Sequence, residues 1–278
     1  MSYLKEVLGS RELLANLTLR EIRGQYKRTV FGQLWSLVNP LAAMVVYTFV
    51  FSFIFRLKPA AGDPSGLDIF ALWLLCGLLP WTFFVNTVTS GMGSLLANAG
   101  LVQKVSFSRI VLPLSSVGSI GYNWLIEMGV LLVALLLVGG SPLPWIPLTL
   151  LTMILLAIFA TGLALMLSVA NVHFRDTQYF LGIIMQIWMY MTPIIYPITL
   201  VQTQSDRVGG LFGTPITLLN VYETNPLERF VSVFRQLLYD NRWPDLNDLV
   251  TCALWAGVSL ALGLWVFRKN EKGLAEAL

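Results

Sequence analysis

Few residues in this sequence could perform chemistry, and one of them stands in an unusual place. Glu127 is the single formal charge inside any of the long apolar segments of the chain. Burying a carboxylate in a membrane interior is costly, so such a group points to a function by default. A proton relay would need further ionisable groups along a path, and Glu127 stands by itself. We therefore favour a structural role, in which Glu127 bonds to a neighbouring helix or faces a wet cavity.

The other reactive residues form no catalytic constellation. His173 is the single histidine, which excludes an H-E-x-x-H zinc site, and its position beside Arg175 and Asp176 is typical of a solvated loop. Cys76 and Cys252 fall in apolar segments, where a thiol behaves as a small hydrophobe. The sequence has no G-x-x-x-x-G-K-[ST] phosphate cradle, so we expect this chain to bind neither ATP nor a metal or other cofactor by itself.

Aromatic residues in or beside the apolar segments have two interpretations. Trp and Tyr at the ends of membrane spans usually form an interfacial belt, which explains Trp35 and Trp265. Aromatic faces also stack on sugar rings while their polar tips bond to hydroxyls, so aromatics in the middle of spans could line a path for a glycan. The candidates for such a path are Tyr47, Trp73, Trp81, Phe84, Trp188, Tyr190 and Tyr196.

Six long apolar segments position these residues and predict an all-α integral membrane protein. A helix needs roughly 20 apolar residues to cross the hydrocarbon core of a bilayer. The composition agrees, because 56% of the residues are hydrophobic and 12% are charged, against roughly half and a quarter in soluble domains. The expected spans are 34–55, 69–91, 110–138, 145–169, 180–200 and 249–267.

The distribution of basic residues predicts the orientation of these spans. We expect residues 1–278 to form one transmembrane domain, with 1–33 before the six spans of 34–267 and a tail at 268–278. Lys and Arg near span ends resist translocation and therefore mark the cytoplasmic side. The side that holds both termini would carry twelve basic residues, and the other side would carry six. Both termini are therefore predicted to be cytoplasmic.

The charged segment 1–33 predicts a helix lying along the cytoplasmic membrane surface. A signal peptide has a short basic start and an apolar centre, whereas Lys5, Arg11 and Glu21 are spread along this segment. Its apolar residues fall near one face at helical spacing, and its cationic side chains can attract lipid headgroups. An ordinary helix that packs on the protein's own spans is the alternative.

The longest external connection, 201–248, is expected to contain a short helix. Asn225 is a capping residue, Pro226 suits the first helical position and Glu228 suits the third. Apolar residues then recur at helical spacing from Leu227 to Leu238. A helix of about 12 to 14 residues is too short to span a bilayer. We therefore expect a short helical hairpin or a re-entrant segment, which packs at the outer face or dips partway in.

Several short motifs follow one another along the chain, beginning with RGQYKRTVFGQLW at 23–35, then Asn39-Pro40, and then GLLPWTFF at 77–84. The first run resembles the N-terminal signature of type-2 ABC exporter permeases for cell-surface polysaccharides, and GLLPWTFF resembles the second span of that family. The match continues in the family's order with LVQKVSFSRIVLP at 101–113, NVHFRD at 171–176, TPIIYP at 192–197 and Asn225-Pro226-Leu227. One departure is Ser108, where many relatives would have a proline, and this change could soften the bend of the loop.

The resemblance implies a function and a set of partners. Within the family the chain is most similar to teichoic acid translocation permeases, with O-antigen and capsule exporters as near relatives and a small-molecule drug exporter as a remoter alternative. The chain would be half of a transporter in the bacterial cell membrane, a homodimer with two copies of a separate ATPase subunit that binds ATP and magnesium. Its substrate would be a lipid-linked polymer, and it would bind membrane lipids but no nucleic acid. A proton-coupled transporter and a membrane enzyme are the rival classes.

Charged residues next to the spans are the candidate contacts for that ATPase. Clustered cytoplasmic charge could dock the ATPase, or could serve only to set the topology and bind lipid headgroups. The loop at Arg175 and Asp176 is short enough to move two spans with little slack, or these two charges could merely cap helix ends. The candidate coupling residues are Arg20, Arg23, Tyr26, Lys27, Arg28, Lys104, Arg109, Arg175 and Asp176.

Overall fold

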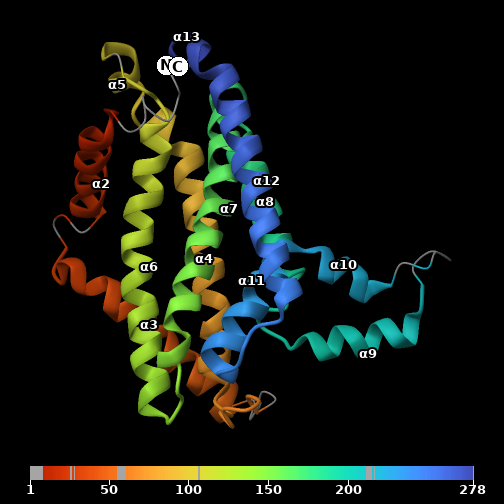
Figure 1. Cartoon of the computed structure of the whole chain (residues 1–278). Coiled ribbons are helices and arrows are strands. Elements are labelled where there is room, and N and C mark those ends of the chain that lie inside the picture. Colours follow the sequence, from red (N-terminus) through yellow and green to blue (C-terminus); the bar gives the residue numbers. More distant parts are fainter. Residues whose placement is uncertain are drawn as a thin grey trace.

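The computed structural model describes residues 9–25, 27, 29–54, 61–105, 107–210, 215 and 217–277. Within these residues the regular secondary structure is helical, apart from one isolated bridge between Gly210 and Thr217. Figure 1 shows the long helices standing side by side, with shorter helices near both ends and one hairpin that reaches outwards. The expectation of an all-α membrane protein is confirmed for the described part of the chain.

Four of the described helices are long and apolar enough to cross a membrane. They correspond to the expected spans 69–91, 110–138, 145–169 and 249–267. At a rise of 1.5 Å per residue they are roughly 37 to 42 Å long, which exceeds the hydrocarbon core of about 30 Å. A short 3-10 turn at Leu143–Trp145 leads into the third. The four helices are α4 (Phe70–Ala97), α6 (Val111–Leu137), α7 (Ile146–His173) and α12 (Leu246–Asn270).

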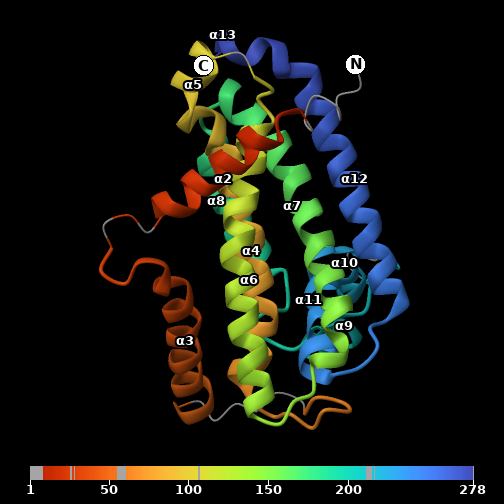
Figure 2. The ribbon, with the colours of Figure 1, turned by 60° about the vertical axis from the view of Figure 1, so that its left-hand side comes forward.

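The other two expected spans form shorter helices. α3 (Trp35–Tyr47) continues as a π-helix over Thr48–Ile54, and it lies at the edge of the bundle beside α6 (Figure 2). α8 (Thr177–Tyr190) has 14 residues, so the expected span 180–200 is wrong as a single helix. The chain turns after α8 because Pro193 and Pro197 lack the amide hydrogen that would continue the helix.

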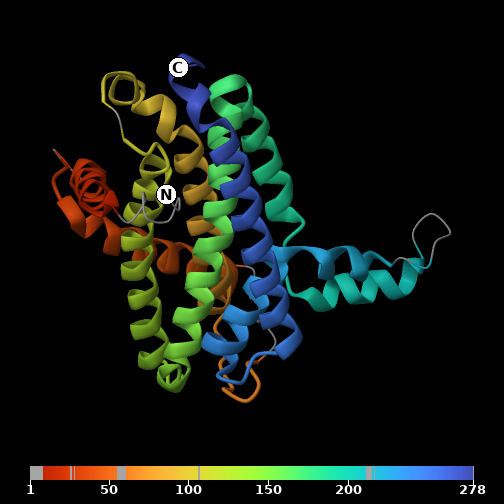
Figure 3. The ribbon, with the colours of Figure 1, turned by 45° about the horizontal axis from the view of Figure 1, so that its top comes forward.

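A helical hairpin follows this turn. α9 (Ile198–Val208) and α10 (Leu218–Thr224) are joined where the Ser205 hydroxyl accepts a hydrogen bond from the backbone N–H of Leu219, at 3.2 Å. Figures 1 and 3 show the hairpin pointing sideways, away from the long helices. The long connection therefore contains a helical hairpin, one of the two forms expected, but residues before Asn225 form it.

The next helix begins where the sequence predicts. α11 (Pro226–Arg235) is capped by Asn225, whose side chain accepts a hydrogen bond from the backbone N–H of Leu227 at 3.1 Å, and a π-helix follows over Gln236–Asp240. α11 packs against α4, α7 and α12, and its Phe230 and Phe234 are fully buried. The helix therefore inserts among the long helices.

Aromatic rings fill the centre of the bundle around α11. The ring of Phe159 stacks on that of Phe84 with 5.6 Å between centroids and on that of Phe230 with 5.9 Å. The rings of Phe83 and Trp124 stack more closely, at 3.9 Å. These rings come from α4, α6, α7 and α11, so aromatic packing joins the four helices into one core.

α7 and α12 approach each other closely at two glycines. A Cβ atom on Gly162 would collide with the backbone of Ser259, and a Cβ atom on Gly263 would collide with the backbone of Gly162. The Ser259 hydroxyl donates a hydrogen bond to the carbonyl oxygen of Phe159, at 2.8 Å. Small residues at this crossing allow the backbones to come together, as is common between membrane helices.

Three short helices gather at one end of the bundle, which we call the terminal end: α2 (Arg11–Gln25), α5 (Ala99–Lys104) and α13 (Leu274–Ala277) (Figure 2). Leu17, Val102, Phe267 and Leu274 are buried together there. The helix expected within 1–33 is present as α2, and it packs on α6. Its position on a membrane surface stays a prediction.

Candidate functional site

Glu21 fastens α2 to α6 at the terminal end. Its carboxylate lies within hydrogen-bonding distance of the hydroxyls of Ser115 (3.0 Å), Ser116 (3.4 Å) and Ser119 (3.1 Å). Each hydroxyl also lies near a carbonyl oxygen of α6, so each can donate to Glu21 or to its own helix. The contact can therefore be released without leaving a hydroxyl unpaired. These serines were not among the residues predicted from the sequence, although their spacing within an apolar segment was an available signal.

The first basic residues expected to couple to a partner lie on α2 or directly after it. Arg20 donates a hydrogen bond through Nη2 to Oδ1 of Asn98, at 2.7 Å, which ties α2 to the end of α4. Arg23 and Lys27 are exposed. Two further candidates lie outside the described residues, Tyr26 and Arg28. The described part of α2 thus presents basic side chains outwards while its inner side is held on α4 and α6.

The two basic residues of the next loop have different surroundings. Lys104 ends α5 and is exposed. The backbone N–H of Arg109 donates to Oε1 of Glu271 at 3.0 Å, and its guanidinium donates to the carbonyl oxygens of Glu271 and Lys272. Arg109 therefore ties this loop to the end of α12, whereas Lys104 is available to a partner. The sequence analysis did not identify Glu271 as the partner of Arg109.

Arg175 and Asp176 occupy an exposed turn between α7 and α8. Asp176 stands at the N-cap position of α8, but its side chain makes no capping hydrogen bond. The Thr177 hydroxyl donates instead to the carbonyl oxygen of Phe174, at 2.6 Å. The Asp176 carboxylate therefore makes no capping hydrogen bond to the end of α8, and its role in coupling stays a prediction.

Three of the aromatic candidates form one cluster. The ring centroid of Phe84 lies 6.0 Å from that of Trp81 and 5.4 Å from that of Trp188. Trp81 and Phe84 are buried in the core, whereas Trp188 is partly exposed on α8. The indole N–H of Trp188 donates to Oδ1 of Asn225 at 2.8 Å, so the end of α8 is joined to the cap of α11. This cluster reaches the surface of the bundle only through Trp188.

The other candidates lie apart from that cluster. The Tyr196 hydroxyl donates to the carbonyl oxygen of Tyr190 at 2.6 Å and lies 3.0 Å from the hydroxyl of Tyr222. Tyr190 itself is 61% exposed. Tyr47 lies on α3, where its ring centroid is 6.1 Å from that of Phe51. The candidates therefore occupy several places along the bundle, and their role in a substrate path stays a prediction.

Trp73 belongs to a separate group at the opposite end of the bundle. The guanidinium carbon of Arg235 lies 3.6 Å from the centroid of the Trp73 ring, which is a cation-π contact. Arg235 also donates through Nη1 to the carbonyl oxygen of Pro193 at 2.7 Å and through Nη2 to that of Ile194 at 2.6 Å. Arg235 therefore holds α4, α11 and the turn after α8 together. No local sequence pattern predicts these contacts of Arg235, because its partners lie about 41 positions away along the chain.

A second charged group lies beside Arg235 on α11. Arg229 donates through Nη1 to Oδ1 of Asp248 at 2.7 Å and lies 3.5 Å from Oε2 of Glu228. Burial raises the pKa of Glu228 to about 7, against the lowering effect of Arg229. These contacts join the start of α11 to the start of α12.

Glu127 lies on α6 and is partly buried. Within the part of the chain that the structure describes, no residue forms a hydrogen bond or an ion pair with it. A bond to a neighbouring helix, one of the two forms of the expected structural role, is therefore absent among the described residues. The other form, a wet cavity, stays a prediction.

The comparison with known proteins identifies the family. The profile of the ABC-2 type transporter family matches residues 12–205. This is more than half of the chain, and the chain belongs to that family. The match includes nearly all of α2, the turn between α7 and α8, and most of α9, so it covers all nine candidate coupling residues.

Three relatives extend the match over nearly the whole chain. The O-antigen export system permease protein RfbA of Klebsiella pneumoniae is 30% identical over 270 residues, which cover 96% of this chain and 95% of the relative. RfbA of Myxococcus xanthus is 27% identical over 274 residues, with 99% and 98% covered. The polysialic acid transport protein KpsM of Escherichia coli is 24% identical over 265 residues, with 93% of each chain covered.

Proposed function

We propose that this chain is the membrane subunit of an ATP-driven exporter for a surface polysaccharide of the O-antigen or capsular class. The observation that carries the proposal is the similarity to O-antigen export permeases over 96% of the chain. The relatives reported above are named for O-antigen and polysialic acid, and none of these names mentions teichoic acid. The comparisons therefore favour the alternative substrate class over the teichoic acid that the sequence motifs suggested.

The proposal includes a separate ATPase on the cytoplasmic side. The sequence has no phosphate cradle, so ATP and magnesium would bind to that partner. The exposed charges of α2, of Lys104 and of the turn at Arg175 and Asp176 support docking at the terminal end, which would then be cytoplasmic. The Glu21 contact supports transmission, because a push on α2 would reach α6 through a bond that can be released.

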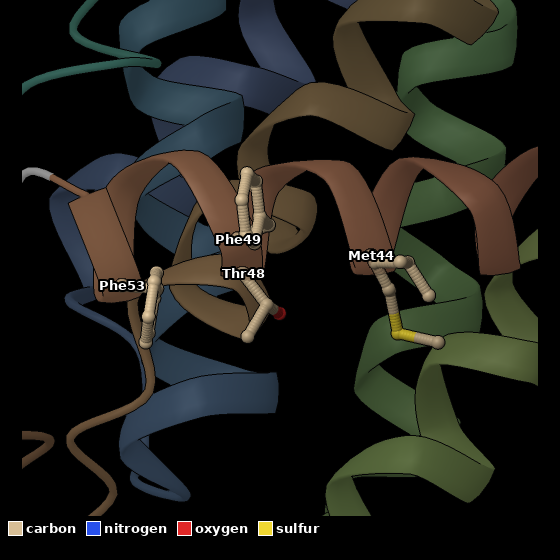
Figure 4. A pocket seen from close by; sticks show the side chains of 5 residues that line it. Met44, Thr48, Phe49 and Phe53 are labelled. Carbon is tan, nitrogen blue, oxygen red and sulfur yellow. The ribbon is translucent and has the colours of Figure 1, made fainter.

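The proposal also includes a second copy of this chain. α3 with its π-helix and α8 stand at the edge of the bundle and expose large apolar side chains, among them Phe53 of the π-helix at 73% and Ile183 of α8 at 58%. A groove of about 620 Å³ on α3 and its π-helix is lined by Met44, Val45, Thr48, Phe49 and Phe53 (Figure 4). Two such apolar faces suit contact with a second copy and with lipid, and a path between two copies would carry a lipid-linked polymer.

Deletion of the gene in its native bacterium tests the proposed function. We expect surface polysaccharide to disappear and lipid-linked polymer to accumulate inside the cell, with both restored by the wild-type gene. Chemical analysis of the retained polymer then distinguishes an O-antigen or capsular glycan from a teichoic acid. Normal surface polymers in the deletion strain, together with drug-stimulated ATP hydrolysis by the purified complex, would instead identify a small-molecule exporter.

A further inference from the structure

A polar pocket of about 260 Å³ lies at the end of the bundle opposite α2. One wall is α11 with its π-helix, the second is the turn and start of α9 at 193–199, and the third is the loop at 61–63 together with Trp73. Five charged residues line it: Asp63, Glu228, Arg235, Asp240 and Arg242. None of them belongs to the aromatic path or to the coupling residues expected from the sequence.

The two faces of α11 differ in polarity, and the polar face lines the pocket. Glu228, Ser232 and Arg235 follow one another at i, i+4 and i+7, so they share one face of the helix, and all three line the pocket. Phe230 and Phe234 lie on the other side and are fully buried in the core. The polar face of α11 is therefore turned towards the pocket while the apolar face holds the helix in place.

Two residues that line the pocket each have a buried polar atom without a hydrogen bond from the described residues. Oε2 of Glu228 has no donor, although the residue is only 7% exposed, and the nearest cation, Nε of Arg229, lies 3.5 Å away. Nε of Arg235 has no acceptor, whereas both Nη atoms of the same side chain are bonded. A buried polar group without a partner is costly, so this pair indicates a place for a ligand that both donates and accepts.

The charges of the pocket select the class of ligand. With a pKa of about 7, Glu228 is only partly ionised at neutral pH, and the carboxylates of Asp63 and Asp240 offset the two guanidinium groups. The Nη atoms of Arg235 are already engaged, so an anion would meet no net attraction. Hydroxyl groups suit this arrangement, because they donate to carboxylates and accept from the remaining N–H of Arg235. Trp73, Pro193 and Pro197 add apolar surface on which the C–H face of a sugar ring can lie. The volume is below the roughly 300 to 1,000 Å³ of sites for drug-sized ligands, which fits one or two sugar rings.

We propose that this pocket binds an uncharged sugar residue of the exported polymer after it has crossed the membrane. The inference rests on the proposed function, since it places the pocket on the outer side and takes its ligand from the transported glycan. The bound sugar bridges Glu228 and Arg235, which occupy successive turns of α11. Because Arg235 also holds the turn after α8, binding at the pocket stabilises the connection between α8 and α11.

The test measures sugar binding to the purified complex of this chain with its ATPase in lipid nanodiscs. Tryptophan is replaced by 5-fluorotryptophan, and the fluorine signal of Trp73 is assigned with Trp73→Phe. Methyl mannoside and maltose are titrated as uncharged probes, and galacturonic acid is the anionic probe. We expect a saturable shift of the Trp73 signal with an uncharged probe and a weaker response to the anionic probe.

Variants decide whether the shift reports on the pocket. Glu228→Gln removes one charged acceptor and is expected to weaken binding about tenfold, the value of one hydrogen bond to a charged group. Ala61→Phe fills the mouth of the pocket from an exposed loop position and leaves the charges in place. Asp206→Asn, at an exposed position of α9 outside the pocket, is the matched control and should bind as the wild type does.

The result also separates this inference from the proposed function. Three results would overturn the pocket assignment, even if deletion of the gene abolishes polysaccharide export. They are no saturable shift in the wild type, binding by Glu228→Gln and Ala61→Phe as tight as that of the wild type, or binding of the anionic sugar as tight as that of the uncharged probes. Saturable binding that both variants lose supports the pocket. If deletion left surface polysaccharide unchanged, the export proposal would fail while the binding result for the pocket still stood.

Discussion

Two carboxylates at opposite ends of the bundle, Glu21 and Glu228, show how the surroundings of the same group differ. Glu21 is partly exposed and has three serine hydroxyls within hydrogen-bonding distance. Glu228 is 7% exposed, yet one of its oxygen atoms has no donor among the described residues. A carboxylate with its bonds made joins two helices, whereas a buried one that lacks a bond indicates a place for a ligand. The terminal end is therefore suited to transmit force, and the opposite end is suited to bind a molecule.

The largest expected effect concerns the two basic residues of the loop at the terminal end, the exposed Lys104 and the partly buried Arg109. Replacing Lys104 and Arg109 together by Glu should release the ATPase from the purified complex, because like charges that face each other across an interface cost several kcal/mol. Quantitative co-purification of the two subunits measures this. Glu271→Ala is the matched control, since it loosens the tie made by Arg109 without reversing charge on this loop. A full complement of ATPase on the double variant, with export intact, would refute docking at this loop.

The second prediction tests transmission through the turn between α7 and α8. Arg175→Ala and Asp176→Ala should leave ATP hydrolysis running while export per ATP falls at least about tenfold, a coupling of about 1.4 kcal/mol or more. Both activities are measured on the same reconstituted complex. Thr177→Ala is the control for local stability, because its hydroxyl bonds the same turn. Lower thermal stability with unchanged export per folded complex would show that the two charges only support helix ends.

The third prediction concerns Trp188, the point where the aromatic cluster reaches the surface. Trp188→Ala should impair export. If the ring acts as core packing, the same change should also lower the free energy of unfolding by about 3 to 5 kcal/mol. Trp188→Phe keeps a ring against Phe84 but removes the hydrogen bond to Asn225. If the ring lines the substrate path, the Phe variant should export far better than the Ala variant at equal expression. A crosslinking substrate analogue that never reaches Trp188 would argue against the path.

The smallest expected effect compares the two carboxylates directly. Glu21→Gln weakens the bonds to three serines and should lower the free energy of unfolding by about 1 to 2 kcal/mol. Glu228→Gln should change it less, because the oxygen without a donor contributes no hydrogen bond to the folded state. Thermal unfolding of the two variants beside the wild type, in the same detergent, measures the difference. Equal losses would mean that Glu228 is as fully bonded as Glu21.

Much of the fold could be predicted from the sequence, because its signals are local. Four runs of apolar residues became the four long helices, since a membrane interior requires their backbone groups to bond within the segment. Asn225 and Pro226 marked the start of α11 for a similarly local reason, a side-chain cap followed by a residue with no amide hydrogen to satisfy.

The prediction of a fifth span at 180–200 was wrong as a single helix, because it considered the apolar composition of the segment and not its prolines. Residues 180–200 are apolar enough to span, but Pro193 and Pro197 end the helix and start a turn. The candidate sites were predicted less well than the fold. Exposed charges such as Lys104 and Arg175 could be located from the loops that carry them, whereas the contacts of Glu21 and Arg235 join segments about 94 and 41 positions apart.

The sequence by itself determined that the chain is helical, that it belongs in a membrane and that its charges cluster beside the spans. Each of these follows from composition and from spacing over one or two helical turns. The tertiary structure decided which polar groups meet. α11 inserts among α4, α7 and α12, and this brings Glu228 and Arg235 beside the 193–199 turn. Hydrogen bonds act over about 3 Å, so the chemistry of a buried pocket depends on how distant segments are packed together.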